Sequence, residues 1–366
     1  QAYGARQWDG TRSILRRSMT VALAFGLAIV VLQVPLRWLT FWLLQAEGEV
    51  AELCKPYYYI CVWGAPAMLG LYVLNGWFVG MQNTRVPMLI AIGQNVVNIG
   101  LSLVLVVGFG MGIRGLAIGT LVAQWTGFLV GLALLSNPKE GKPQHASPVG
   151  QASPPRGRLE GALFLRTLCL VSVNLYFTSA GSAQGPLVLA ANTLLMQFFM
   201  LYSYILDGFA NAGEALAGRY LGACDWPMLS RTVRRLFLWG GGVALLFTAA
   251  YRLGGPSLLR LLTSDNAVVG MALTYLPWAV LIPVAGMGAF VWDGIFIGTT
   301  RSRGMLQSCF LAAVAFFLLW LLFSPTLHNH ALWLALLVYL ALRGLVQTVI
   351  WSRQFRRDSL RSLGGG

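Results

Sequence analysis

The chain has 366 residues, of which 57% are hydrophobic and only 10% are charged, and its formal net charge is +14. A soluble domain carries about a quarter charged residues, so this composition excludes a soluble globular protein and indicates a polytopic membrane protein. The excess of positive charge does not indicate a nucleic-acid partner, because it is concentrated in the segments between apolar stretches.

Ten stretches are apolar and long enough to cross a bilayer, which takes about 20 residues in a helix. We therefore predict an all-α protein with ten transmembrane helices in this chain. The predicted spans are residues 18–44, 53–80, 87–108, 114–136, 160–181, 187–218, 233–262, 268–299, 305–323 and 331–351.

The segments that connect the spans are alternately rich and poor in Lys and Arg. If the N-terminal segment is inside, the inside segments hold 20 of the 26 Lys and Arg residues, with Arg166 counted among them. Glu47, Glu49, Glu52 and Asp265 fall on the other side. Cytoplasmic segments carry an excess of Lys and Arg, so the pattern predicts that both termini are cytoplasmic.

Three polar residues lie on one face of the predicted 87–108 helix. Asn95, Asn98 and Ser102 are spaced at i, i+3 and i+7, which places them in one stripe. Polar side chains at membrane depth either hydrogen-bond to a neighbouring helix or line a cavity. The sequence leaves both interpretations open.

Glycine patterns suggest tight turns and close helix packing. Gly110-Met-Gly-Ile-Arg-Gly115 matches a dinucleotide-binding fingerprint, but it joins two membrane-length stretches and not a strand to a helix, so we interpret it as a turn. Small residues four apart let helix backbones approach closely. This pattern occurs at 76–80, 115–119, 127–131 and 294–298.

The stretch from Tyr204 to Gly218 is apolar but carries two acids. Asp207, Asn211 and Glu214 stand at i, i+4 and i+7, so on a helix they share one face. A carboxylate at membrane depth is costly, and such groups usually face a cavity, a partner or a transport path. We favour an ion-coupling or substrate-binding role, with helix-to-helix bonding as the alternative.

Asp293 is the third acid within a predicted span. Because it lies near a helix end, it either has a functional role or caps the helix or pairs with Arg301 or Arg303. His328 and His330 are predicted to lie in a solvated loop, and we predict no metal site. No zinc-protease, serine-hydrolase or nucleotide-binding motif is present, so we expect neither an enzyme nor a bound cofactor.

An internal repeat organises the chain. With a shift of 218 residues and no gap, Trp8 aligns with Trp226, the Gly-x-Phe-x-Gly of 76–80 with that of 294–298, and Arg85 with Arg303. Matches of Trp and Arg that hold register across several loops indicate a duplication. Asp293 aligns with Asn75, which makes Asn75 a candidate as well.

The repeat predicts two lobes of six helices each in a complete protein. The second copy begins near Arg158, about 60 residues before the equivalent of Gln1, so we expect the first copy to lack two helices and the chain alone to fold and transport poorly. Copies with an even number of helices share one orientation, about an axis along the membrane normal. We predict an N-terminal lobe at 1–136, a Pro- and Gly-rich cytoplasmic linker at 137–159, a C-terminal lobe at 160–352 and a cytoplasmic tail at 353–366.

Three segments resemble the multidrug and toxic compound extrusion (MATE) family, and its DinF-like branch most closely. They are Leu206-Asp-Gly-Phe-Ala-x-Ala-x-Glu-Ala-Leu, Phe164-Leu-Arg-Thr-Leu-Cys169 and Trp292-Asp-Gly-Ile-Phe-Ile-Gly-Thr-Thr-Arg301. The resemblance implies two lobes around a central cavity, a bacterial inner-membrane location, and export of amphipathic, often cationic compounds by proton or sodium antiport. The family's Asn-x-x-x-Asp motif is altered here, because Ser102 stands four residues after Asn98, at the position where the motif has Asp.

These observations together predict a monomeric secondary exporter that works by alternating access between its lobes. A flippase for a lipid-linked glycan precursor is the first alternative, and it would require a strongly cationic cavity for a pyrophosphate. A membrane scaffold that transports nothing is the second, and the acids at membrane depth argue against it.

Overall fold

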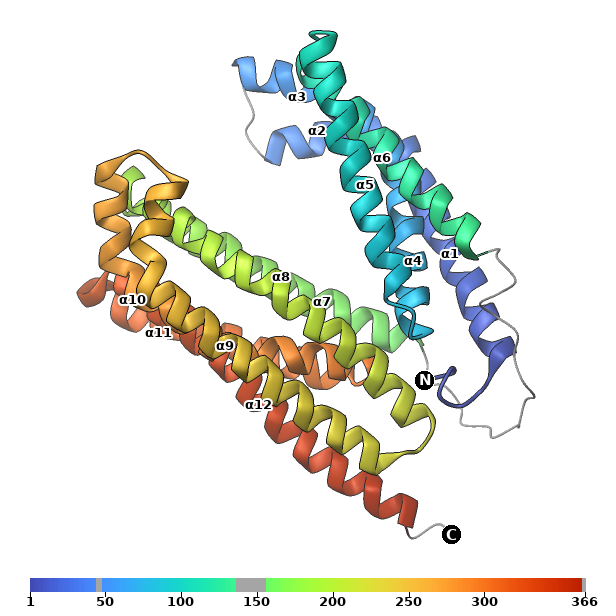
Figure 1. Cartoon of the computed structure of the whole chain (residues 1–366). Coiled ribbons are helices and arrows are strands. Elements are labelled where there is room, and N and C mark those ends of the chain that lie inside the picture. Colours follow the sequence, from blue (N-terminus) through green and yellow to red (C-terminus); the bar gives the residue numbers. More distant parts are fainter. Residues whose placement is uncertain (44–47, 136–155, 364–366) are drawn as a thin grey trace. The chain divides into compact units, whose positions relative to one another are not determined.

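A computed structural model describes residues 1–43, 48–135 and 156–363 of the chain (Figure 1). Helices make up nearly all of these residues, and no strand occurs among them. Ten helical segments in the described ranges are long and apolar enough to cross a membrane. The all-α class and the number of spans are therefore as predicted.

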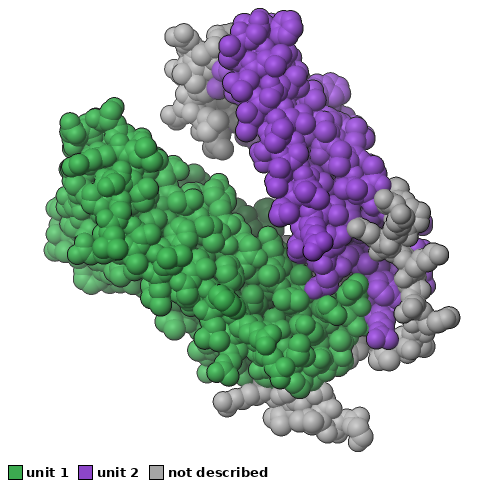
Figure 2. All heavy atoms as spheres, in the orientation of Figure 1, with its two compact units in different colours: residues 1, 3–5, 149–366 green, residues 2, 6–148 purple. Residues whose placement is uncertain are grey.

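The helices group into two compact units, which are coloured separately in Figure 2. Unit 2 contains the first six α-helices. Within it, α1 packs on α4, and α6 packs on α3, α4 and α5. The bounds are α1 Trp8–Val31, α2 Gln33–Leu43, α3 Gly48–Cys61, α4 Ala65–Gly80, α5 Arg85–Leu103 and α6 Gly112–Leu135, with a 3-10 turn η1 at Val62–Gly64 and a π-helical turn η2 at Val104–Gly108.

Unit 1 contains the last six helices together with Gln1 and Tyr3–Ala5. Helix α10 is its centre and packs against α8, α9 and α12, while α11 packs against α7 and α12. The bounds are α7 Arg156–Ala183, α8 Pro186–Gly222, α9 Trp226–Leu262, α10 Asn266–Gly298, α11 Ser302–Leu327 and α12 Asn329–Leu363. The carboxylates of Asp225 and Asp265 accept backbone N–H bonds at the starts of α9 and α10, which fixes where these helices begin.

The first predicted span, 18–44, is wrong in its bounds. The membrane-length helix starts ten residues earlier, at Trp8, and ends at Val31, and a separate α2 begins at Gln33. Pro35 explains the break, because a proline has no N–H to donate and its ring clashes with the carbonyl four residues before it.

Two other predicted boundaries also differ from the structure. Helix α7 begins at Arg156, inside the predicted linker, and the rest of that linker up to residue 155 lies outside the described residues. Helix α12 continues to Leu363, through most of the predicted tail. Arginine-rich ends can therefore extend a membrane helix beyond its apolar stretch, where hydropathy gives no signal. The division into lobes at these boundaries stays a prediction.

The 218-residue repeat reappears in the backbone. Helices α1 and α9 start at Trp8 and Trp226, and α4 and α10 end at Gly80 and Gly298. Positive φ angles occur at Arg6 and Cys224 and again at Gln82 and Thr300, each pair 218 residues apart. The turn bonds repeat with the same offset: Asn83 N to Phe78 O is matched by Arg301 N to Phe296 O, both 2.8 to 2.9 Å. Non-glycine residues rarely adopt positive φ, so these coincidences support a duplication.

The small-residue pattern of α10 has the packing role that we predicted. A Cβ added to Gly294 would lie 1.9 Å from the Ala210 carbonyl oxygen, and one added to Gly298 would lie 2.2 Å from the Glu214 carbonyl oxygen. Helices α8 and α10 thus touch backbone to backbone, on the segment of α8 that carries the predicted acidic stripe. The equivalent residues of unit 2, Gly76 and Gly80, have nothing within 4 Å of an added Cβ.

Gly294→Ala is expected to destabilise unit 1, because the new methyl group meets backbone that can move only if the two helices separate. Overpacking of this kind typically costs about 1–3 kcal/mol. The melting temperature of the detergent-purified protein, followed by tryptophan fluorescence, measures the effect. Gly76→Ala is the matched control at the equivalent position and should leave the melting temperature unchanged. Equal effects of the two substitutions would contradict the packing role.

Candidate functional site

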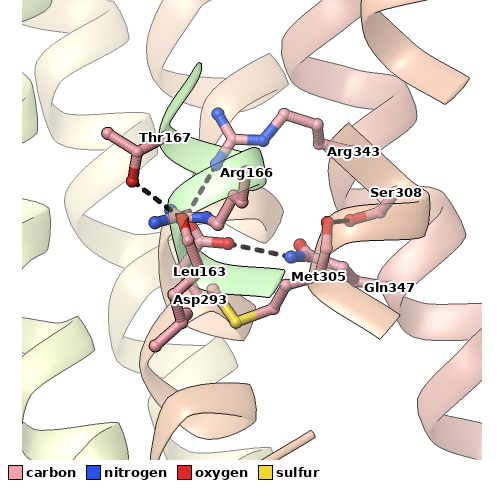
Figure 3. Close-up of polar contacts among 8 residues, drawn as sticks. All are labelled: Leu163, Arg166, Thr167, Asp293, Met305, Ser308, Arg343 and Gln347. Carbon is pink, nitrogen blue, oxygen red and sulfur yellow. Dashed lines mark hydrogen bonds and ion pairs between the residues drawn. The ribbon is translucent and has the colours of Figure 1, made fainter. Parts of the chain in front are cut away.

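Asp293 lies at the centre of a buried ion-pair network in unit 1 (Figure 3). Its Oδ2 accepts hydrogen bonds from Nη2 of Arg166 and from Nη2 of Arg343, the latter at 2.6 Å, and its Oδ1 accepts one from Nε2 of Gln347 at 2.8 Å. Asp293 is 7% exposed, Arg343 5% and Gln347 0%. Both carboxylate oxygens are therefore engaged by donors from other helices.

Three helices bring this network together. Asp293 is on α10, Arg166 on α7, and Arg343 and Gln347 share one face of α12 at i and i+4. Two guanidinium groups against one carboxylate leave a formal charge of +1 among these side chains. Because both oxygens of Asp293 are bonded to donors from α7 and α12, the arrangement is suited to holding α7, α10 and α12 together.

One of the alternatives for Asp293, pairing with Arg301 or Arg303, is wrong. Asp293 pairs with Arg166 and Arg343, not with Arg301 or Arg303. Arg166, which we counted among the cytoplasmic segments, lies within the membrane-length part of α7. Asp293 is bonded to arginines of two other helices, and not to the arginines that follow it in the sequence.

Sequence reasoning missed Arg343 and Gln347. Arg343 lies in the middle of the predicted 331–351 span, and the rule that singles out acids at membrane depth applies equally to bases. Tyr339, one turn before it, places its ring 5.5 Å from the Arg343 guanidinium carbon. If the rule had been applied to basic as well as acidic residues, it would have singled out Arg343.

The network has no counterpart in unit 2. The residues 218 positions before Asp293, Arg343 and Gln347 are Asn75, Trp125 and Leu129, so all the charges are replaced by neutral groups. Asn75 is half-buried, and its Oδ1 has no hydrogen-bond partner among the described residues.

The three residues of the predicted acidic stripe lie on one face of α8, as their spacing requires. Asp207 and Asn211 are exposed, and Glu214, one turn further along, is half-buried. Asp207, although it lies within a predicted span, is thus not buried by the described residues. Within the described residues, none of the three side chains forms an ion pair or a hydrogen bond, so Asn211 does not orient either carboxylate. Asp207 is near enough to Asp293 for their negative charges to repel each other.

The polar stripe of α5 divides into two parts. Ser102 Oγ donates to Asn98 Oδ1 at 3.1 Å, and Thr120 of α6 approaches the same oxygen at 3.5 Å. Asn95 is exposed and donates to Ala91 O of its own helix. Only the contact from Thr120 joins two helices, and it involves Asn98, while the bonds of Ser102 and Asn95 stay within α5. Thr120 was not predicted.

The remaining motifs carry no site. Gly110, just before α6, and Gly112, the first residue of α6, both have positive φ, which supports the interpretation of that motif as a turn. His330 was wrongly predicted to be in a loop: it is in the first turn of α12, where its Nδ1 accepts from Trp278 Nε1 at 2.9 Å. No cluster of metal-ligating side chains occurs among the described residues.

Comparisons with known proteins agree with the fold. The MatE family model matches residues 1–104 and 162–326. DNA damage-inducible protein F of Escherichia coli (strain K12) is 37% identical over 365 residues, which cover 98% of this chain and 79% of that protein. The probable multidrug resistance protein NorM of Photorhabdus laumondii is 22% identical, with 72% of this chain and 60% of that protein covered.

A solved structure also resembles the chain. The crystal structure of a MATE protein in the bent conformation has a TM-score of 0.86 at 20% identity, over 100% of this chain and 82% of that one. At this identity the likeness supports the fold alone, whereas the family model and the Escherichia coli relative identify the family. The chain is a multi-pass membrane protein that belongs to the MatE family, the family that its sequence motifs resemble.

Proposed function

We propose that this protein is a secondary exporter of amphipathic, often cationic compounds, driven by antiport of protons or sodium ions across a bacterial inner membrane. Alternating access of its two lobes would move the substrate, and the protein would act as a monomer with both termini in the cytoplasm. Membership of the MatE family and the likeness to a probable multidrug resistance protein support export as the direction.

The observation that carries the proposal is the pair of unengaged carboxylates on α8. Asp207 and Glu214 lie one above the other on a membrane-length helix and make no ion pair among the described residues. A free carboxylate binds a proton, a sodium ion or a cationic substrate, but not two of these at once. Such competition lets each ligand favour the conformation that binds it better, which is what antiport requires.

Asp293 then has a supporting role. Its carboxylate is occupied by Arg166, Arg343 and Gln347, so a proton or cation would first have to displace these donors. We infer that Asp293 positions the helices that surround the stripe, and that Asn75, Asn95, Asn98 and Ser102 contribute to packing or to substrate contact in the other unit.

Transport in proteoliposomes tests the proposal. Protein expressed from its complete reading frame is reconstituted, and movement of ethidium, a fluorescent amphipathic cation, is followed under an imposed proton gradient, an imposed sodium gradient, or neither. We expect one of the two gradients to accelerate ethidium movement above that of empty liposomes. Equal rates in all three conditions would contradict coupled antiport.

A second candidate is the flipping of a lipid-linked glycan precursor, favoured by the two arginines within the helices of unit 1. Their charges could attract a pyrophosphate, although both guanidinium groups already contact Asp293. The same liposomes discriminate the candidates: a flippase would translocate a fluorescent lipid pyrophosphate and leave ethidium in place.

A further inference from the structure

An open groove runs along unit 1 between α9 and α12, with α10 as its floor. Its cavity volume is about 430 Å³. Ser230, Arg234 and Phe237 line it from α9, Met287 from α10 and Trp351 from α12. Ser230, Arg234 and Phe237 follow each other at helical spacing, so one wall of the groove is polar at the start of α9 and apolar further along.

The polar end of the groove is strongly basic. Arg231, Arg234 and Arg235 all occur within the first ten residues of α9. The guanidinium carbon of Arg301 lies 5.0 Å from the ring centroid of Trp351 and adds a positive charge beside the groove wall. Asp225, an acid at this end, uses its carboxylate to cap α9, where it accepts a hydrogen bond from Met228 N. Arg234 is exposed and forms no ion pair within the described part of the chain.

The apolar end of the groove continues into a surface suited to lipid. Leu238 also lines the groove. Leu238, Trp239, Leu245 and Leu246 on α9 are 65%, 70%, 65% and 66% exposed. Exposed apolar side chains along a membrane-length helix are those that meet acyl chains. The groove therefore offers a cationic mouth and an apolar body at the end of the bundle where basic residues gather.

We propose that this groove binds one acidic phospholipid, of the phosphatidylglycerol type. Arg234 and the Ser230 hydroxyl contact the phosphate, and an acyl chain lies along Phe237, Leu238 and Met287. Basic pockets between transmembrane helices select anionic head groups in this way. A cationic substrate would be repelled by the arginines, and a zwitterionic lipid has no net negative charge to offer them.

Lipid titration of the full protein tests the proposal. Delipidated protein in detergent is titrated with phosphatidylglycerol or with phosphatidylcholine, and bound lipid is counted by native mass spectrometry. We expect one tightly retained phosphatidylglycerol and no retained phosphatidylcholine. Loss of one arginine–lipid contact weakens binding about fivefold, so Arg234→Gln should raise the apparent Kd by about that factor.

Arg252→Gln is the matched control, because it removes the same charge from an exposed position of α9 that lies far from the basic end and does not line the groove. It should leave binding nearly unchanged. Ser230→Phe fills the mouth of the groove without changing the charge, so it should abolish lipid binding. This variant tests the lipid site independently if Arg234→Gln is poorly folded. Equal losses for Arg234→Gln and Arg252→Gln, unchanged binding in Ser230→Phe, or equal retention of both lipids would overturn the proposal.

Discussion

Replacement of Asp293 by Asn is expected to destabilise unit 1 more than any other single substitution of its polar residues. The substitution leaves Arg166 and Arg343 without their shared counter-charge, and Arg343 is 5% exposed. Removal of one partner from a buried pair costs about 3–5 kcal/mol. The result should be less inserted protein in membranes and a much lower melting temperature in detergent, both measured on the purified full protein.

Two controls separate this effect from a general sensitivity of α10. Asp265→Asn changes the acid that caps the start of the same helix, but Asn also caps helices well, so the melting temperature should stay the same. Arg343→Gln alone should destabilise the protein, and combining it with Asp293→Asn should cost less than the sum of the two single changes, because each removes the other's unpaired charge. A wild-type melting temperature for Asp293→Asn, or strict additivity, would show that the network does not hold the helices together.

Hydropathy and the repeat predicted most of the fold, because both depend on local composition. The number of spans and the register of the duplication needed only runs of apolar residues and matching Trp, Gly and Arg positions. Hydropathy gave the wrong helix bounds where a proline breaks a helix or where charged residues continue one. Pro35 ends the first helix early, and the arginines after Trp351 continue α12 beyond its apolar stretch.

The site was only partly predictable, for a different physical reason. Residues on one helix, such as Asp207 and Glu214, are brought together by helical spacing, so the sequence places them correctly. The three partners of Asp293 lie 127, 50 and 54 residues away in the chain, and only the packing of α7 and α12 beside α10 selects them. A single sequence shows that an ionisable residue at membrane depth needs a partner, but it does not say which one.

The structure also distinguishes acids that the sequence treats alike. Asp293 is buried with every carboxylate oxygen bonded, whereas Asp207 is exposed and Glu214 is half-buried with no bonded partner among the described residues. An acid whose bonds are all satisfied contributes to stability, and an acid without bonds costs energy unless a ligand uses it. We therefore expect the loss of Asp293 and the loss of the α8 acids to have different consequences.

Glu214→Gln is expected to abolish ion-coupled efflux without reducing the amount of folded protein. The amide has nearly the shape of the carboxylic acid, but it takes up no proton at neutral pH and has no negative charge to attract a cation, so competition between ion and substrate is lost. Asp207→Asn should act in the same direction and more weakly, because Glu214 is the more enclosed of the two and lies where α8 touches Gly298 of α10. The measurement is ethidium efflux per inserted molecule, across a range of pH and sodium concentration.

Glu214→Asp and Asp293→Asn complete the test. Glu214→Asp keeps a carboxylate and should retain part of the ion dependence. Asp293→Asn should lower the number of inserted molecules and leave efflux per molecule close to wild type, because its role is to position helices. If Glu214→Gln and Asp207→Asn both keep wild-type efflux with unchanged ion dependence, coupling does not pass through α8. If instead they only reduce insertion, the acids of the stripe are structural, and the free carboxylates do not bind the coupling ion.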